Sequence, residues 1–197
     1  MTDILVLVHS VHGNTLTMGR EVARGVEQVK GCQARLRAVA PVTSAIDPRT
    51  VHPPEQGPAL VGPEDLVECD GLILGSPTRF GNMASAVKHF LDGTGSEWFS
   101  GTLAGKAAGV FTSTSTLHGG QEATLLSMMV PLLHHGMILV GLPYTEPLLS
   151  STKSGGTPYG ASHLAGPDSD RAVDEDERKL CRALGRRVAE TACKLAS

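Results

Sequence analysis

Five short apolar runs spaced along the chain constrain the fold more than any other feature. They are residues 4–8, 34–39, 71–76, 107–112 and 137–142. Continuous apolar runs are typical of strands covered on both sides, and helical patterns lie between them, as in a parallel sheet with helices on both faces. The sequence therefore predicts one α/β domain over residues 1–197, which is long enough to bury a sizeable core.

Three other segments carry information about the fold. Residues 121–136 are apolar on nearly every face, which predicts a helix buried all round, either in the core or at a subunit interface. Pro131 is expected to kink or end this helix near residue 130. Two long irregular segments, 40–63 and 143–173, are expected to be functional or disordered, because structureless loops of that length are uncommon in a compact domain.

Composition excludes several classes of function. Seventeen Lys and Arg against 20 Asp and Glu give a net charge of -3, which disfavours nucleic acid and anionic membranes as partners. The N-terminal run 4–8 is too short to span a membrane and lacks the features of a leader, so we expect a cytoplasmic protein with no integral membrane segment.

No C-x-x-C pair occurs, which predicts no metal site and no disulfide framework. The expected buried, reduced thiols are Cys32, Cys69, Cys181 and Cys193.

Loops of small and hydroxyl-bearing residues follow the first, third and fourth apolar runs. They cover residues 10–15, 76–82 and 113–120. In a parallel sheet these loops share the carboxyl edge, where open α/β folds bind ligands. Their convergence predicts a binding site at that edge.

The first loop has the character of a phosphate cradle. Ser10, Asn14 and Thr15 offer side-chain donors, Gly13 permits a tight turn, and a helix N-terminus follows. Neither a Walker A motif nor a G-x-G-x-x-G fingerprint is present, which favours a retained monophosphate over phosphoryl transfer. The alternative is an ordinary helix cap.

The second loop is suited to a flat heterocycle. Pro77 fixes the backbone, Thr78 and Asn82 can hydrogen-bond a ring edge, and Phe80 can cover an aromatic ring. Arg79 supplies a permanent positive charge, which favours a cofactor that becomes anionic on reduction. Alternatively, Phe80 packs in the core and Arg79 is a solvated charge.

The third loop adds hydroxyl groups and backbone amides to the same edge. Ser113, Ser115 and Thr116 can line the rim of a flat ligand. The alternative is a loop that caps the helix beginning near Gln121.

Four stretches in order along the chain resemble one known family almost from end to end. They are PTRFGNM (77–83), VFTSTSTLHGGQE (110–122), LLHHGM (132–137) and GGTPYGASHLAG (155–166). On these motifs the sequence resembles the WrbA family of flavodoxin-like proteins, the type IV NAD(P)H:quinone oxidoreductases.

The resemblance implies a flavodoxin-like, doubly wound, five-stranded parallel sheet of order 2-1-3-4-5, with FMN at the switch point between its first and third strands. It also implies a homotetramer that reduces quinones to hydroquinones by two electrons, in a ping-pong hydride transfer through FMN with NADH or NADPH as reductant. The partners are then a quinone and a nicotinamide nucleotide, and no nucleic acid.

The resemblance also assigns residues. The FMN contacts would be Ser10, Val11, His12, Gly13, Asn14 and Thr15 in the first loop, Pro77, Thr78, Arg79 and Phe80 in the second, and Ser113, Thr114, Ser115, Thr116, Leu117 and His118 in the third. Trp98 matches an aromatic residue beside the quinone and nicotinamide site, and His134 a histidine near the flavin face. His12 stands where the family commonly has a tyrosine near the nicotinamide, and its imidazole offers a smaller stacking face and a titratable proton.

Two residues receive chemical roles, and the activity has two rivals. Arg79 is expected to stabilise the reduced cofactor, and His134 to hydrogen-bond or protonate the quinone, unless it is a core histidine. Trp98 is expected to wall the substrate cleft, its alternative being surface packing. The rival functions are a flavodoxin-type single-electron carrier, against which the nearly balanced charge counts, and a regulatory protein-binding module, for which no recognition motif is present.

Overall fold

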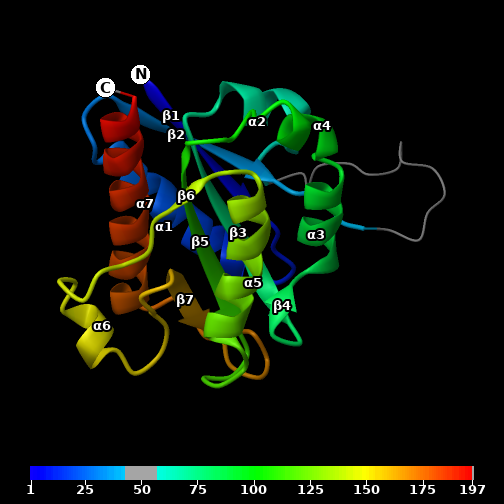
Figure 1. Ribbon diagram of the computed structural model, residues 1–197. Coiled ribbons are helices and arrows are strands. Elements are labelled where there is room, and N and C mark those ends of the chain that lie inside the picture. Colours follow the sequence, from blue (N-terminus) through cyan, green and yellow to red (C-terminus); the bar gives the residue numbers. More distant parts are fainter. Residues whose placement is uncertain (43–56, 197) are drawn as a thin grey trace.

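The structure, a computed structural model, describes residues 1–42 and 57–196; residues 43–56 of the irregular segment 40–63 lie outside the described residues. Strands and helices alternate through the described part (Figure 1). The strands are β1 (Thr2–Val8), β2 (Cys32–Ala38), β3 (Gly71–Arg79), β4 (Asn82–Met83), β5 (Ala107–Thr114), β6 (Ile138–Leu139) and β7 (Ala161–Leu164). The helices are α1 (Asn14–Glu27), α2 (Pro63–Glu68), α3 (Ser85–Asp92), α4 (Gly95–Phe99), α5 (Gln121–His134), α6 (Leu148–Ser151) and α7 (Glu175–Leu195).

The central sheet is parallel and has the order β2-β1-β3-β5-β6. This confirms the predicted order 2-1-3-4-5, since β5 is the fourth predicted strand and β6 starts the fifth. Helices α1 and α7 cover one face of the sheet, and α3 and α5 cover the other (Figure 1). The fold is therefore α/β and doubly wound, as predicted.

Strand β1 shows how the sequence divides the core between the two faces. Ile4, Val6 and Val8 pack in the cluster that contains α1 and α7, whereas Leu5 and Leu7 pack in the cluster that contains α3 and α5. Side chains alternate between faces along a strand, so a run that is apolar at every position is covered on both sides.

The fifth predicted strand, residues 137–142, is shorter than expected. Only Ile138–Leu139 form β6, beside the start of β5. The chain then leaves the sheet and returns as β7, which pairs with the end of β5 from Phe111 to Thr114. Val140 N–H still donates to Ala108 O of β5 at 2.7 Å, whereas Leu142 N–H donates to Pro158 O at 2.9 Å, so by Leu142 the chain is bonded to the segment before β7.

Helix α5 departs from one prediction about residues 121–136, since it does not end near residue 130. Helix α5 continues through Pro131 to His134, because proline removes one hydrogen bond while His135 N–H still donates to Pro131 O at 3.0 Å. Within the single chain the helix is buried on one face only, so it is not the central core helix of the first alternative, and burial at a subunit interface stays a prediction. Leu125 and Leu132 are fully buried, whereas Val130 and Leu133 are more than half exposed in the single chain.

Candidate functional site

A small polar cavity lies where β1, β3, β5 and β7 end. Its volume is about 50 Å³, enough for a small polar group but far below the several hundred Å³ of a pocket that encloses a whole ligand. Its walls come from all three predicted loops and from one further segment: Ser10, Val11, His12, Asn14, Thr15, Pro77, Thr78, Arg79, Ser113, Thr114, Ser115, Ala165 and Ser169. A single chain can therefore enclose a small anionic group at this edge.

The first loop turns tightly from β1 into α1. Gly13 has φ 89°, which L side chains rarely adopt, and it immediately precedes the first residue of α1, so free backbone amides point toward the cavity. Thr15 is buried, and the buried Ser10 Oγ has no hydrogen-bond partner within the described residues. An unpaired hydroxyl beside a helix N-terminus fits an anionic oxygen, so these residues fit the phosphate of FMN.

The second loop is a hairpin in which β3 pairs with the short antiparallel β4. Phe80 lies at its tip with φ 52°, an unusual backbone for a phenylalanine, and its side chain is fully exposed. Phe80 does not line the small cavity, and it is not the core residue of the alternative interpretation. Its strained, solvent-facing position is typical of a residue that contacts a ligand.

Arg79 provides the positive charge of this edge. It lines the cavity, is exposed, and forms no ion pair with a carboxylate in the described parts of the chain. The pKa of His9 lies below its usual value. Burial lowers it most, a backbone hydrogen bond with Val39 raises it, and the positive charge of Arg79 lowers it further. The edge therefore carries a field that favours anions.

The third loop continues β5. Ser113 and Thr114 are buried, and the Thr114 hydroxyl donates to Thr116 O at 2.9 Å. Ser115 reaches the cavity, whereas Thr116, Leu117 and His118 are exposed and do not line it. The loop ends at Gly120, where a Cβ would lie 2.9 Å from Gly81 Cα, so a glycine is needed for the second and third loops to approach.

Sequence reasoning missed one wall of the cavity, the turn that follows β7. Ser169 has φ 58°, and its carbonyl accepts a hydrogen bond of 2.8 Å from Asn14 Nδ2. Ala165 and Ser169 both line the cavity. The only signal in the sequence was the Gly, Pro, Asp and Ser composition of 166–169, which predicts a turn but not its place in the fold.

A buried carboxylate holds this turn in place. Glu177 is fully buried; its Oε1 accepts from Gly155 N, Leu164 N and Arg171 Nη1, each at 3.1 Å. Its Oε2 accepts from His163 Nδ1 at 2.8 Å and from Asp174 N at 2.9 Å. Burial raises the pKa of Glu177, but hydrogen bonds from His163, Asp174 and Leu164 outweigh it and bring the pKa down from 4.5 to about 2.

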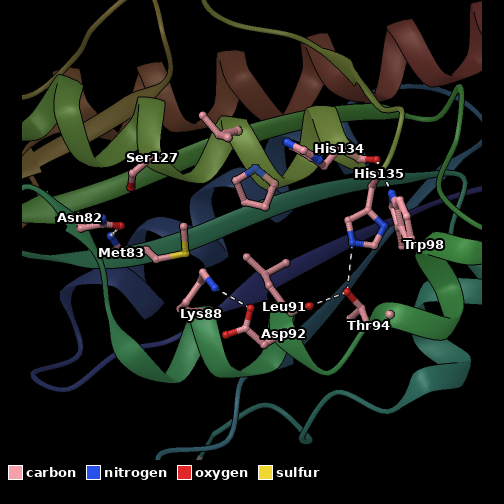
Figure 2. A pocket seen from close by; sticks show the side chains of 13 residues that line it. Asn82, Met83, Lys88, Leu91, Asp92, Thr94, Trp98, Ser127, His134 and His135 are labelled. Atoms are coloured by element: carbon pink, nitrogen blue, oxygen red, sulfur yellow. Dashed lines mark hydrogen bonds and ion pairs between the residues drawn. The ribbon is translucent and has the colours of Figure 1, made fainter.

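Trp98 and His134 do not line the small cavity. They border a second pocket of about 560 Å³ between α3, α4 and α5, together with Val130 and Pro131 (Figure 2). Trp98 Nε1 donates to His134 O at 2.8 Å, so the two predicted residues are adjacent. Of the three predicted loops only the second reaches this pocket, through Asn82, which lines it and does not line the small cavity. The first and third loops contribute no residue to it.

His135 lines the same pocket but has a structural role. Its Nε2 lies 3.0 Å from the Thr94 hydroxyl, which itself donates to Leu91 O, so His135 must be the donor (Figure 2). Burial, followed by a raising effect of Glu97 and a lowering effect of His134, leaves the pKa of His135 below its usual value. His135 is thus neutral near pH 7 and ties α5 to the start of α4.

Two kinds of feature are absent from the part of the chain that the structure describes. No helix among residues 1–42 and 57–196 has the length and apolarity needed to cross a membrane. The same residues contain no group of three or more His, Cys, Asp or Glu side chains that could hold a metal ion.

The fold and the cradle together define a flavodoxin-like protein whose carboxyl edge fits a flavin mononucleotide. The sequence profile of the family described as NADPH-dependent FMN reductase matches residues 2–145, and the chain belongs to that family. The motif-based prediction of the WrbA family is also confirmed by the relatives and by the structural neighbour below.

Curated relatives cover the whole chain. Proteins named NAD(P)H dehydrogenase (quinone) from Chromohalobacter salexigens and Trichlorobacter lovleyi are each 44% identical to it, over 100% and 99% of both chains respectively. Among solved structures, a flavodoxin, WrbA-like protein from Agrobacterium tumefaciens is similar, with a TM-score of 0.70 and 25% identity over 98% of this chain and 99% of that one.

Proposed function

We propose that the protein is an FMN-dependent NAD(P)H:quinone oxidoreductase that reduces quinones to hydroquinones by two electrons. The observation that carries the proposal is the donor-lined cavity at the sheet edge, with the unpaired Ser10 hydroxyl and the free charge of Arg79. The names of full-length relatives at 44% identity support the same activity.

The three loops would hold the cofactor at different points. Ser10, Asn14 and Thr15 bind the phosphate with the amides of α1, and Thr78 and Arg79 contact the ring system. The remaining assignments, which rest on the resemblance, are Val11, His12, Gly13, Pro77, Phe80 and residues 113–118. When bound, FMN supplies the redox chemistry, taking hydride from NAD(P)H and giving two electrons to the quinone.

The substrate side of the site would come from a second copy of the chain, in a homotetramer. The small cavity can enclose only the phosphate end of FMN, so the exposed ring needs another cover. Trp98, Phe99, Val130 and Leu133 present an exposed apolar surface beside His134. In the assembly, Trp98 would wall the quinone site and His134 would hydrogen-bond or protonate the quinone, with His12 near the nicotinamide.

A single domain over residues 1–197 and a cytoplasmic location complete the proposal. Both rest on the sequence reasoning above. The described cysteines are free thiols, which suits a reducing compartment.

Anaerobic titration of the FMN-loaded protein with NADH or NADPH tests the activity. We expect the visible absorbance of oxidised flavin to disappear with one equivalent of nucleotide and to return when one equivalent of benzoquinone is added. If neither nucleotide bleaches the flavin, the protein is not this enzyme, and a single-electron carrier becomes the better interpretation.

Replacing Arg79 by alanine should lower the midpoint potential of bound FMN by about 30 mV. A cation close to the ring stabilises the anionic reduced form by about 1.4 kcal/mol in a partly exposed site, and 30 mV corresponds to that energy for a two-electron couple. The measurement is an equilibrium redox titration against a dye. Arg187→Ala, which removes the same charge from the exposed side of α7, is the control and should leave the potential unchanged. An unshifted potential in Arg79→Ala would remove Arg79 from this role.

A further inference from the structure

Two cysteines that are far apart in the sequence meet at the amino edge of the sheet. Cys32 begins β2, Cys193 lies in the last turn of α7, and their Sγ atoms are 3.2 Å apart across a sequence separation of 161 residues. In Figure 1 the end of α7 and the start of β1 lie at the same end of the molecule. The loops of the candidate flavin site occupy the opposite, carboxyl edge.

The surroundings leave this pair accessible. Both side chains are only half-buried, whereas Cys69 and Cys181 are buried in the core. The Cys193 thiol also contacts the Thr2 hydroxyl at 3.5 Å, and Thr2 pairs with Cys32 in the β1–β2 register. Three chain segments therefore hold the two sulfurs together without closing them off from solvent.

We propose that Cys32 and Cys193 form a reversible intramolecular disulfide when the protein meets a peroxide. A disulfide has a sulfur–sulfur distance of about 2.05 Å, so the sulfurs must approach by about 1 Å. Both lie near the ends of their elements, where rotation of side chains and a small backbone adjustment can supply that movement. The bond would tie the edge strand β2 to the C-terminal helix.

The chemistry balances with hydrogen peroxide as the oxidant. The Cys193 sulfur attacks the peroxide, the O–O bond breaks, and a sulfenic acid and one water form. The Cys32 sulfur then attacks the Cys193 sulfur, the S–O bond breaks, and the leaving oxygen takes the Cys32 proton as a second water. Two thiols thus lose two electrons and two protons, and one peroxide becomes two waters.

The product does not depend on which sulfur reacts first. Burial, and then the hydrogen bond and charge of the Cys193 thiol, raise the pKa of Cys32 to about 11. Whichever sulfur is oxidised, the other lies 3.2 Å away and resolves the sulfenic acid. A dithiol reductant reverses the bond by exchange.

Peptide mapping by mass spectrometry tests the proposal on the full-length protein. The reduced chain is treated with hydrogen peroxide, and remaining thiols are alkylated after denaturation. We expect one linked peptide pair that contains Cys32 and Cys193, with Cys69 and Cys181 alkylated as internal controls. After dithiothreitol all four thiols should be alkylated.

A second readout separates the linkage from other oxidation products. Closing so long a loop should raise the melting temperature of the treated wild type by about 10 °C. Treated Cys193→Ser should show no such rise, since serine retains the contact with Thr2 but cannot form the bond. A sulfinic acid without the linked peptide, or a bond between two chains, would overturn the proposal, and the peptide map of the wild type decides even if the variant does not fold.

Discussion

Replacing Glu177 by glutamine lowers the free energy of unfolding by about 3–5 kcal/mol, although the two side chains have nearly the same shape. The carboxylate accepts five hydrogen bonds in a fully buried position, including one from His163 and one from Arg171. A glutamine amide carries two N–H donors on one side. Whichever carboxylate oxygen the amide nitrogen replaces, its N–H groups face N–H donors that are already there, so at least one backbone N–H group loses its acceptor and the negative charge beside Arg171 is lost.

Urea unfolding of the wild type and Glu177→Gln measures this loss. The matched control is Glu175→Gln in the same turn of α7, where the glutamate side chain is 59% exposed and its ion pair with Arg182 is 3.6 Å long. That change should stay within about 0.5 kcal/mol. Equal stabilities for the two variants would mean that the buried network contributes nothing.

Glu177 also gives stability a pH dependence of known sign. The pKa of Glu177 is lower in the folded protein, about 2, than its ordinary value of 4.5. Its contribution is therefore fully present above pH 4.5 and is lost as the pH falls toward 2, a total of about 3 kcal/mol. Unfolding measured between pH 2 and pH 6 should show a steeper acid loss in the wild type than in Glu177→Gln.

The effect extends to the candidate flavin site. Glu177 bonds Arg171, whose Nη1 also donates to Leu164 O, so the network holds both ends of the turn that carries Ala165 and Ser169. Loosening this turn would free Asn14 from the Ser169 carbonyl. FMN affinity should therefore fall in Glu177→Gln and remain unchanged in Glu175→Gln.

This network also shows where sequence reasoning ends. The apolar runs predicted the strands and their order, because a strand covered on both sides has a local signature. The loops after β1, β3 and β5 were predicted to converge because parallel strands share an edge, and they do. Carboxylates such as those of residues 174–177 are typical of a helix start, and Asp174 is the N-cap of α7.

Long-range contacts, by contrast, have no local signature. The spacing Asp174-x-x-Glu177 is that of a capping box and marks Glu177 rather than Glu175 as its partner, but it does not predict that Glu177 is buried, since burial is decided by β7 packing on α7. The turn 165–169 looked like part of an irregular segment, because the hydrogen bond from Asn14 joins residues 155 positions apart. The family resemblance named Trp98 and His134 as site residues but did not predict where in the fold they lie. The structure places both of them on a separate pocket.

Replacing Gly185 by alanine should destabilise the protein by about 3 kcal/mol, although alanine is the better helix former by about 1 kcal/mol. Gly185 lies in α7, where its added Cβ would meet Val22 O of α1 at 2.0 Å. The same crossing is tight from the other side, because a Cβ on Gly25 would meet Arg182 O at 2.1 Å. Both obstacles are backbone atoms within helices, so neither can rotate away and the helices must separate.

Combining the two glycine substitutions tests whether they disrupt the same helix crossing or destabilise the protein independently. One alanine already separates the two helices, so a second alanine at the same crossing disrupts few further contacts. The loss in free energy of unfolding for Gly25→Ala/Gly185→Ala should therefore be clearly smaller than the sum of the losses for the two single variants. Gly95→Ala is the control, since a Cβ there meets no atom within 4 Å in the described structure. Additive losses in the double variant would contradict a shared contact.

The displacement should also reach the candidate flavin site, because α1 begins at Asn14 and buries Thr15 beside the cavity. A helix pushed away from α7 at Val22 carries its N-terminal amides with it. We therefore expect weaker FMN binding in Gly185→Ala at temperatures where the protein is still folded, measured by quenching of flavin fluorescence. Unchanged FMN affinity in a folded Gly185→Ala would mean that only the middle of α1 is displaced. The phosphate cradle would then be held by the turns at Gly13 and Ser169 rather than by the crossing of the two helices.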